Sequence, residues 1–281
     1  MKEDISCGVP IRHLQVCRPG RRKPGFFCGY VILLSRTFCY KTYKNHVVIA
    51  QMINLFISLH YRNHHYGNMY YDKIIDMRFF DREQEFEKLR EIEELSHEVA
   101  QFTIITGRRR IGKTEMIKKF YENKTMLYFF VARKAEADLC DIFVDEIRTK
   151  LNIPMLDSKV KSFADVFKFI MELSQTQHIN LFIDEFQDFY RVNPSIYSDM
   201  QNIWDSCKNK AHINLIVAGS VNTLMNKIFK DKKQPLFGRQ TETMHIRSFK
   251  PSVLKEIMSE YCPGYKKSDL LALYTLTGGV A

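Results

Sequence analysis

The sequence of 281 residues contains no long uninterrupted apolar run, and this absence limits its relation to membranes. The apolar stretch at residues 47–59 is interrupted by Gln51 and Asn54. It is shorter than the roughly 20 consecutive apolar residues that span a bilayer. It also starts too late for a signal peptide and has no clear small-residue cleavage site. The sequence therefore predicts neither a transmembrane segment nor a secretion signal.

Cysteines at the paired spacing of zinc sites are also missing. The four cysteines before residue 40 lie ten or eleven positions apart, unlike the ligand pairs of a zinc finger. The histidines within residues 60–65 have no cysteine or carboxylate at a useful spacing. A metal site built from these residues is therefore not expected. The remaining cysteines are isolated, and they fit a reducing cytoplasm: Cys140, Cys207 and Cys262.

Acidic residues are scarce in one part of the chain only. Residues 1–76 hold 11 of the 42 Lys and Arg residues but only 4 of the 32 Asp and Glu residues. The rest of the chain is close to neutral, so a large surface for a nucleic-acid backbone is not indicated there. We expect residues 1–76 to be a poorly ordered or non-native extension, with Met69 or Met77 as a start codon. The alternative is a disordered basic arm or a membrane-surface segment.

Glycine is uncommon in this chain, yet two glycines frame its most informative motif. Residues 107–114 read Gly-Arg-Arg-Arg-Ile-Gly-Lys-Thr and match the pattern G-x-x-x-x-G-K-[ST]. An apolar run at residues 102–106 precedes the motif and predicts a buried strand. Apolar residues at helical spacing follow it up to Tyr121. Strand, glycine loop and helix in this order indicate a P-loop, which binds a polyphosphate.

Each position of the motif has a chemical reason. Backbone amides of the loop form a concavity for anions, and the N-terminus of the following helix adds positive potential. Lys113 is expected to reach the β- and γ-phosphates, and the Thr114 hydroxyl to complete a Mg²⁺ shell. The side chains of Arg108, Arg109 and Arg110 are free to face solvent or a partner. The residues expected to hold the nucleotide are Gly107, Arg108, Arg109, Arg110, Ile111, Gly112, Lys113, Thr114 and Glu115.

A second apolar run, residues 179–183, ends in the acidic pair Asp184 and Glu185. Functional groups of open α/β sheets lie at the carboxyl ends of their strands, which is where this pair stands. We expect Asp184 to hold Mg²⁺ and Glu185 to polarise the water that attacks the γ-phosphate. An acid placed for water favours hydrolysis over transfer to a small-molecule hydroxyl.

A third apolar run, residues 213–218, is followed by Gly219 and Ser220. A polar side chain at this strand end is in a position to contact the γ-phosphate or the attacking water. Serine is also a favoured N-cap, and a helix is expected directly after it. Both interpretations of Ser220 stay open.

The remainder of the chain after residue 80 alternates between helical and strand patterns, without internal repeats, as in an α/β protein. The helix at residues 81–98 is expected to bury Phe86, Leu89, Ile92 and Leu95. Further helices are expected at residues 136–151, 162–174, 195–208, 251–261 and 267–275. Further strands are expected at residues 125–131 and 241–246.

Five motifs occur in an order that resembles one known family. They are Phe80-Asp81-Arg82-Glu83, the P-loop, Asp184-Glu185-Phe186-Gln187, Ala218-Gly219-Ser220 and Pro235-Leu236-Phe237-Gly238-Arg239. The chain is similar over residues 77–281 to the archaeal-type ATPases of the AAA+ class. The resemblance implies an α/β P-loop NTPase fold, a three-layer sandwich with a five-stranded parallel sheet. It also implies that the P-loop strand lies beside the strand ending at Ser220, and that residues 80–83 lie near the adenine.

The resemblance also bears on two later segments. Arg239 is expected to stabilise transition-state charge, in cis or from a neighbouring subunit; the alternative is a surface arginine in a basic loop. Residues 77–250 are expected to form the ATPase domain, and residues 251–281 the beginning of a truncated helical lid. Lid closure excludes water, so ATP binding is a firmer expectation than efficient turnover.

These observations predict an ATP-binding protein, with Mg²⁺-dependent hydrolysis coupled to conformational change in an unknown partner. Adenine is preferred over guanine because of the resemblance, and no N-K-x-D motif is evident. The alternative is a nucleotide-dependent switch that recruits protein or DNA with little hydrolysis. The client is unknown, a homo-oligomer is possible, and a cytoplasmic location is expected.

Overall fold

A computed structural model describes residues 79–153, 160 and 162–279 of the chain. The expectations for residues 1–76, including their histidines and start codons, lie outside the described residues. The described residues belong to one compact unit, Lys73–Ala281. Within them, no helix combines the length and apolarity that crossing a bilayer requires.

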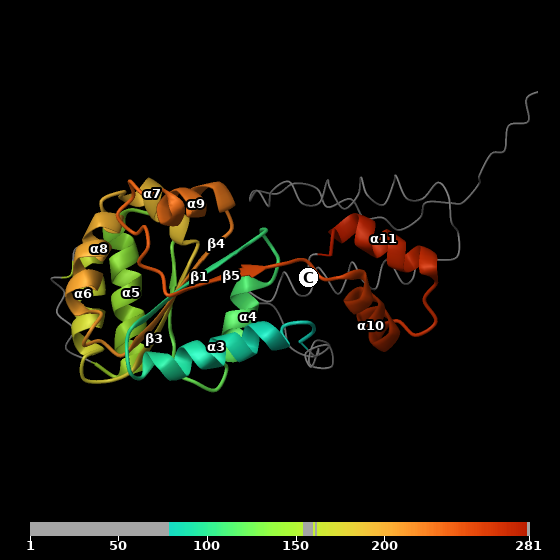
Figure 1. Ribbon diagram of the computed structural model, residues 1–281, viewed down its shortest axis with the longest axis horizontal. Helices are drawn as coiled ribbons and strands as arrows, with labels where there is room; N and C mark the ends of the chain where they lie inside the picture. Colours follow the sequence, from blue (N-terminus) through green and yellow to red (C-terminus); the bar gives the residue numbers. More distant parts are fainter. Residues whose placement is uncertain (1–78, 154–159, 161, 280–281) are drawn as a thin grey trace, which may run out of the picture. The chain divides into compact units, whose positions relative to one another are not determined.

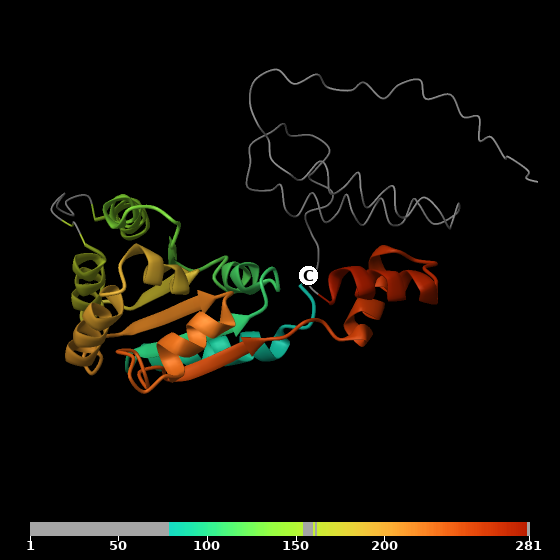
Figure 2. The same ribbon diagram turned by 90° about the horizontal axis from the view of Figure 1, so that it is seen from above.

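Five strands form one sheet, which Figures 1 and 2 show from two sides. The strands are β1 Gln101–Gly107, β2 Leu127–Phe130, β3 Ile179–Asp184, β4 Ile213–Gly219 and β5 Glu242–Ile246. Their order is β2-β3-β4-β1-β5, and every pairing is parallel. The expected five-stranded parallel sheet is therefore confirmed, with the P-loop strand β1 beside β4. Because the strands are parallel, the segments after β1, β3 and β4 leave the same edge of the sheet.

Helices between and before the strands cover both faces of the sheet (Figure 1). They are α3 Glu83–Ser96, α4 Lys113–Phe120, α5 Glu136–Leu151, α6 Phe163–Leu173, α7 Phe189–Val192, α8 Ile196–Cys207 and α9 Asn222–Lys230, and two more, α10 Pro251–Tyr261 and α11 Lys267–Thr277, follow β5. A short 3-10 helix, η1 Phe186–Asp188, follows β3. Apolar residues of α5, α6, α8 and α9 share one core with the sheet, and those of α3 and α4 share the other. These two cores and the sheet make up three layers.

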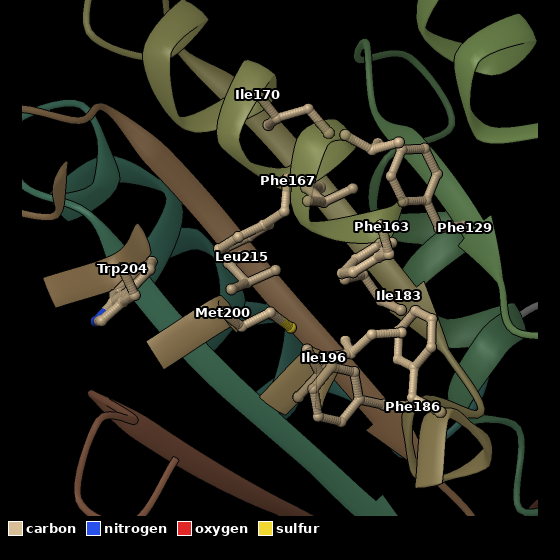
Figure 3. Packing of buried hydrophobic residues seen from close by; sticks show 14 of the residues in the cluster. Phe129, Phe163, Phe167, Ile170, Ile183, Phe186, Ile196, Met200, Trp204 and Leu215 are labelled. Carbon is tan, nitrogen blue, oxygen red and sulfur yellow. The ribbon is translucent and has the colours of Figure 1, made fainter. Parts of the chain in front are cut away.

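The larger core explains the continuous apolar runs of the central strands. All six residues of β3 and all seven of β4 are buried, as expected for strands covered on both faces. The stripe of α6 packs here through Phe163, Phe167 and Ile170, near Leu215 of β4 (Figure 3). Its helix is capped by Ser162, whose side chain accepts a hydrogen bond from the amide of Asp165.

The buried face of α3 differs from the expected stripe at its C-terminal end. Leu89 and Ile92 are buried, but Leu95 is 51% exposed. Glu93 and Ser96 lie on the buried side instead. Glu93 pairs with Lys124, and the Ser96 hydroxyl lies 2.7 Å from Nε2 of His178. The prediction for Leu95 was wrong because Glu93 and Ser96 lie on the buried side of the helix instead. Their polar partners, Lys124 and His178, are distant in sequence and make the burial of these polar side chains possible.

Two helices follow β5, where the start of a helical lid is expected. Helix α10 begins with Pro251 at its first turn, a position that needs no backbone donor. Leu254 and Met258 of α10 are buried, whereas α11 has no buried residue and exposes Leu271. The lid role of α10 and α11 stays a prediction.

Candidate functional site

The loop between β1 and α4 is shaped by its two glycines. A Cβ on Gly107 would lie 2.7 Å from the backbone oxygen of Ile246 in β5, closer than a side chain tolerates. Gly112 is the N-cap of α4 and has φ 88°, which is in the left-handed region that favours glycine. Arg110 also has positive φ, 64°, and a non-glycine residue held in this region is uncommon outside turns and functional sites.

The polar groups of this loop suit an anion. Within the described residues, the amides of Arg108, Arg109, Arg110 and Gly112 donate to no oxygen of the chain. The three arginine side chains are exposed, whereas Ile111 is buried in the core beneath the loop. Unpaired amides beside a helix N-terminus form a binding site for phosphate. The loop therefore fits the polyphosphate expected from its sequence.

Lys113 supplies the cation of this cradle. Its side chain is buried, and Nζ donates to the backbone oxygens of Gly107 at 3.1 Å and Arg108 at 3.2 Å. Burial lowers the pKa of Lys113, while the nearby carboxylates of Glu185 and Asp184 act in the opposite direction. The ammonium group thus bonds only neutral oxygens, and a phosphate would offer it a stronger, charge-assisted partner.

Asp184 at the end of β3 lies against the start of α4. The Thr114 hydroxyl donates to Oδ2 of Asp184 at 2.6 Å, and the Glu185 amide donates to Oδ1 at 2.9 Å. Burial raises the pKa of Asp184, and these two hydrogen bonds oppose that rise. A hydroxyl and a carboxylate at one point are oxygen ligands of the kind that Mg²⁺ prefers. The donor set therefore fits this ion, with Thr114 and Asp184 as the residues that would hold it.

Sequence reasoning missed Tyr128 of β2, whose hydroxyl lies 3.3 Å from the same oxygen of Asp184. Burial first, and then the Asp184 charge, raise the pKa of Tyr128, so this hydroxyl remains a donor. The parallel register pairs Tyr128 with Phe182, two residues before Asp184. A tyrosine near the end of a neighbouring strand is a signal only once the strand order is known.

Glu185 stands directly after β3 and has φ 53°. Its carboxylate accepts from the Ser220 hydroxyl, with distances of 2.8 Å to Oε2 and 3.2 Å to Oε1. It also accepts from Nε2 of Gln187, 2.5 Å from Oε2. The structure thus joins the end of β3 to the end of β4 through one carboxylate. Gln187 stands in the quoted motif, but its side chain was not among the expected site residues.

The structure separates the two interpretations of Ser220. The N-cap of α9 is Val221, and no side chain caps this helix. The Ser220 hydroxyl instead bonds Glu185, so the capping interpretation was wrong. Its contact with a γ-phosphate stays a prediction.

Glu115 belongs to the first turn of α4, but its side chain is exposed. Its carboxylate lies 3.9 Å from Nζ of Lys118, one turn further along the helix. Among the expected nucleotide-binding residues, Glu115 therefore has its side chain in solvent, and its backbone is the part available for phosphate.

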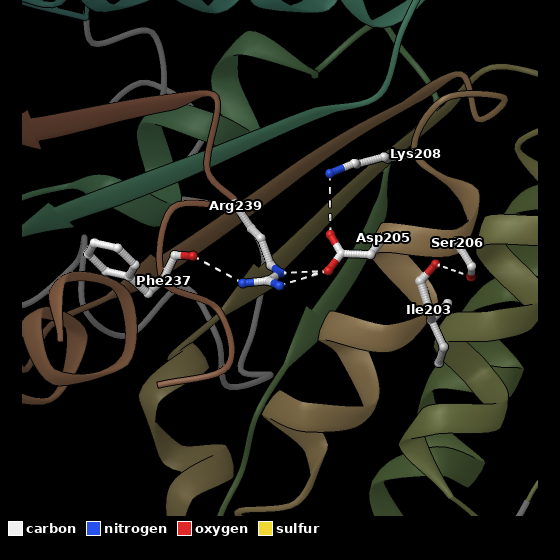
Figure 4. A network of polar contacts seen from close by, with 6 residues as sticks. All are labelled: Ile203, Asp205, Ser206, Lys208, Phe237 and Arg239. Carbon is white, nitrogen blue, oxygen red and sulfur yellow. Dashed lines mark hydrogen bonds and ion pairs between the residues drawn. The ribbon is translucent and has the colours of Figure 1, made fainter. Parts of the chain in front are cut away.

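Arg239 lies apart from these groups. Its Nε and Nη2 donate to Oδ2 of Asp205 at 3.0 and 2.7 Å, and Nη1 donates to the Phe237 oxygen at 3.1 Å (Figure 4). Asp205 is near the end of α8, which leads to the start of β4, and Thr241 bonds Phe102 at the start of β1. This is the edge of the sheet opposite the P-loop. A role of Arg239 in cis does not fit this placement, and a role in trans stays a prediction.

Residues 80–83 contact the segment that joins β5 to α10. Arg82 is buried, its Nη2 donates to the Arg247 oxygen at 3.0 Å, and its guanidinium lies 4.8 Å from the ring centre of Phe249. The Phe80 ring meets Tyr261 of α10 at 6.0 Å. The position of the adenine near these residues stays a prediction.

Comparisons with known proteins agree with this geometry. A family model described as an ATPase domain predominantly from Archaea matches residues 79–281. An uncharacterised protein of Methanocaldococcus jannaschii, MJECL04, is 27% identical over 202 residues, which are 72% of this chain and 42% of that protein.

Two solved structures share the fold. The Walker-type ATPase paby2304 of Pyrococcus abyssi has TM-score 0.55 and 21% identity, covering 72% of this chain and 64% of that one. The Aeropyrum pernix ORC2 protein, solved in ADPNP–ADP complexes, has TM-score 0.50 and 17% identity, with coverages of 65% and 52%. This chain thus spans less than two thirds of the length of each of these relatives.

Proposed function

The chain belongs to the family of ATPase domains found predominantly in Archaea, and we propose that it binds ATP with Mg²⁺ and hydrolyses the γ-phosphate. We further propose that hydrolysis drives a conformational change in a partner protein or DNA. One observation carries the proposal most directly. The Thr114 hydroxyl lies 2.6 Å from Asp184, and the next residue, Glu185, is held by Ser220.

The chain's own residues divide the task. The loop amides and Lys113 would bind the β- and γ-phosphates, and burial of Lys113 keeps water from competing for them. Thr114 and Asp184 would hold Mg²⁺, which neutralises charge that develops on the phosphate oxygens. Glu185 would orient the attacking water, and the Ser220 hydroxyl fixes the Glu185 carboxylate. Phosphoryl transfer needs mainly positioning and charge stabilisation, and this set supplies both.

The cysteines of the described region, Cys140, Cys207 and Cys262, are free. We propose a cytoplasmic location from this thiol chemistry.

The second candidate function is a nucleotide-dependent switch with little hydrolysis. We propose it because α11, one of the two helices proposed as a lid, has no buried residue and exposes Leu271 and Leu276. In enzymes whose lid closes over the substrate, closure excludes water from the site. A lid that stays open would therefore slow hydrolysis more than it would weaken ATP binding.

Glu185→Gln separates the two functions on the full chain. Equilibrium binding of ATP with Mg²⁺ and phosphate release would be measured for both proteins. An ATPase should keep its ATP affinity and lose turnover by about 10²- to 10⁴-fold. A switch would show almost no turnover to lose.

Lys113→Ala tests the site itself and should abolish ATP binding under both functions. Lys119→Ala is the matched control, because Lys119 is exposed on the same helix and pairs with Glu122. Full ATP affinity in Lys113→Ala, or an equal loss in both variants, would reject the proposed site.

A further inference from the structure

Gln187 is an unusual buried side chain. It is 1% exposed and lies in η1, two residues after Glu185. Its Nε2 donates to Oε2 of Glu185 at 2.5 Å. A carboxylate can only accept, so the amide must present its nitrogen to Glu185. This orientation leaves Oε1 of Gln187 buried without a partner among the described residues. An unpaired buried oxygen costs stability, and thus stability alone does not explain Gln187.

The space for this amide depends on Gly219 at the end of β4. A Cβ on Gly219 would lie 2.5 Å from Oε1 of Gln187 and 2.4 Å from Sδ of Met225. The Gln187 side chain therefore rests against the β4 backbone, one residue before Ser220. Its own backbone is held separately, since the Tyr197 hydroxyl lies 3.4 Å from the Gln187 oxygen and 3.3 Å from the Phe186 oxygen.

The two oxygens of Glu185 are not equivalent. Oε2 accepts from Gln187 at 2.5 Å and from Ser220 at 2.8 Å. Within the described residues, Oε1 has only Ser220, at 3.2 Å. A carboxylate has about four lone-pair sites, so Oε1 keeps the greater capacity to accept a further hydrogen bond.

We propose that Gln187 is a positioning residue that holds Glu185 through Oε2 and leaves Oε1 to the attacking water. Ser220 is only partly buried, and its hydroxyl can rotate toward a phosphate oxygen. Gln187 is enclosed, so it is the donor that stays on Glu185 when Ser220 turns away. This inference rests on the proposed hydrolysis of ATP.

Gln187→Met tests it on the full chain, because methionine keeps the length of the side chain and removes the donor. We expect kcat to fall on the order of 10- to 100-fold, as for other residues that orient a catalytic group, with KM nearly unchanged. Affinity for the complex of ADP, Mg²⁺ and aluminium fluoride, which mimics the transition state, should fall in the same proportion. Affinity for ADP alone should not change.

Two further proteins distinguish positioning from a structural role. Asn214→Leu is the control, because this buried amide also has an oxygen without a partner among the described residues, but its Nδ2 donates to Tyr121 and not to Glu185. Its kcat should match the unsubstituted chain. In a Glu185→Gln background, Gln187→Met should cause no further loss of affinity for the aluminium fluoride complex. If Gln187→Met fails to fold, as judged by its denaturation midpoint, Gln187→Asn tests the same contact, because it shortens the amide by one methylene.

A kcat for folded Gln187→Met equal to that of the unsubstituted chain would overturn the inference alone. The inference would also be overturned if Gln187→Met lowered the affinity for the aluminium fluoride complex as much in the Glu185→Gln background as in the unsubstituted chain. Gln187 would then act independently of Glu185. If the unsubstituted chain shows no hydrolysis that depends on Glu185, the proposed function fails, and this inference fails with it.

Discussion

Thr114 and Asp184 are 70 positions apart in the chain, and the Thr114 hydroxyl donates a 2.6 Å hydrogen bond to Oδ2 of Asp184. The contact depends on the strand order. β1 and β3 both neighbour β4, so the helix that follows β1 begins beside the end of β3. Two residues that would share a metal ion are therefore already oriented toward one another by the sheet.

Removal of this hydroxyl should weaken the response to Mg²⁺. We expect Thr114→Val to raise the Mg²⁺ concentration needed for half-maximal ATP binding by about 10-fold or more, because one oxygen ligand and one hydrogen bond to Asp184 are lost. The measurement is an ATP-binding titration with Mg²⁺ at fixed nucleotide. Thr114→Ser keeps the hydroxyl and should stay within about 3-fold of the unsubstituted chain. An unchanged Mg²⁺ titration in Thr114→Val would show that Thr114 does not hold the ion.

Gly112 and Gly238 offer a matched pair of backbone tests. Both have positive φ, 88° and 70°, and a Cβ would meet nothing within 4 Å at either position. Alanine at each should therefore cost about 1–2 kcal/mol of unfolding free energy, from backbone strain alone. Only Gly112→Ala should also weaken ATP binding, since Gly112 starts α4 at the phosphate cradle.

Denaturant unfolding and ATP binding would be measured for both glycine variants. Equal losses of ATP affinity would contradict the placement of the cradle, because Gly238 lies in the loop that precedes Arg239, at the other edge of the sheet.

Much of the fold could be predicted because its signals are local. The helices at residues 136–151 and 251–261 have the expected bounds, because apolar spacing runs along each of them. Asn152, in the left-handed conformation, ends the first, and Pro251 begins the second. The central strands are mostly apolar runs, which is typical of strands in a sheet covered on both faces. The P-loop residues and the acidic pair could be predicted for the same reason, because each motif is contiguous.

Contacts between distant segments could not be predicted. The link from Tyr128 to Asp184 depends on strand register, and the link from Gln187 to Glu185 depends on the left-handed turn after β3. Ser220 was open to two interpretations because a serine between a strand and a helix is expected both for a helix cap and for a donor at the strand end. Leu95 followed the apolar spacing of α3, but Glu93 and Ser96 found polar partners that no local pattern reveals.

The lowered pKa of His178 predicts that the folded chain loses stability in acid. Burial, followed by the neighbouring charge of His97, lowers the pKa of His178 from 6.5 to about 4. The unfolded chain therefore binds a proton at this ring between pH 6.5 and about 4 that the folded chain does not bind. Stability contributed by His178 is present above pH 6.5 and is lost as pH falls through this window. His212 and Lys124 also lower this pKa, and Glu93 alone opposes them.

The test is the free energy of unfolding at several pH values for the unsubstituted chain and His178→Gln. Because the ring is partly exposed to solvent, screening reduces the effect, and we expect the chain to lose about 1 kcal/mol more than the variant between pH 6.5 and 4. Parallel pH profiles for the two proteins would show that His178 is not the group responsible.

Substitutions of Arg239 and of its partner Asp205 distinguish a structural role of Arg239 from a role in trans. Their ion pair is partly exposed, with side-chain exposures of 21% and 38%, so breaking it should cost no more than about 1 kcal/mol of unfolding free energy. Asp205→Ala and Arg239→Ala should each have a small cost of this kind, and neither should change ATP affinity, because the pair lies at the edge opposite the P-loop. If Arg239 reaches the nucleotide of a neighbouring copy, Arg239→Ala alone should lower turnover per chain, and only at protein concentrations where copies associate. Asp205→Ala would leave Arg239 free for that contact and should keep turnover. Turnover measured against protein concentration for both variants decides the matter: equal turnover for the two at every concentration would leave Arg239 a structural partner of α8.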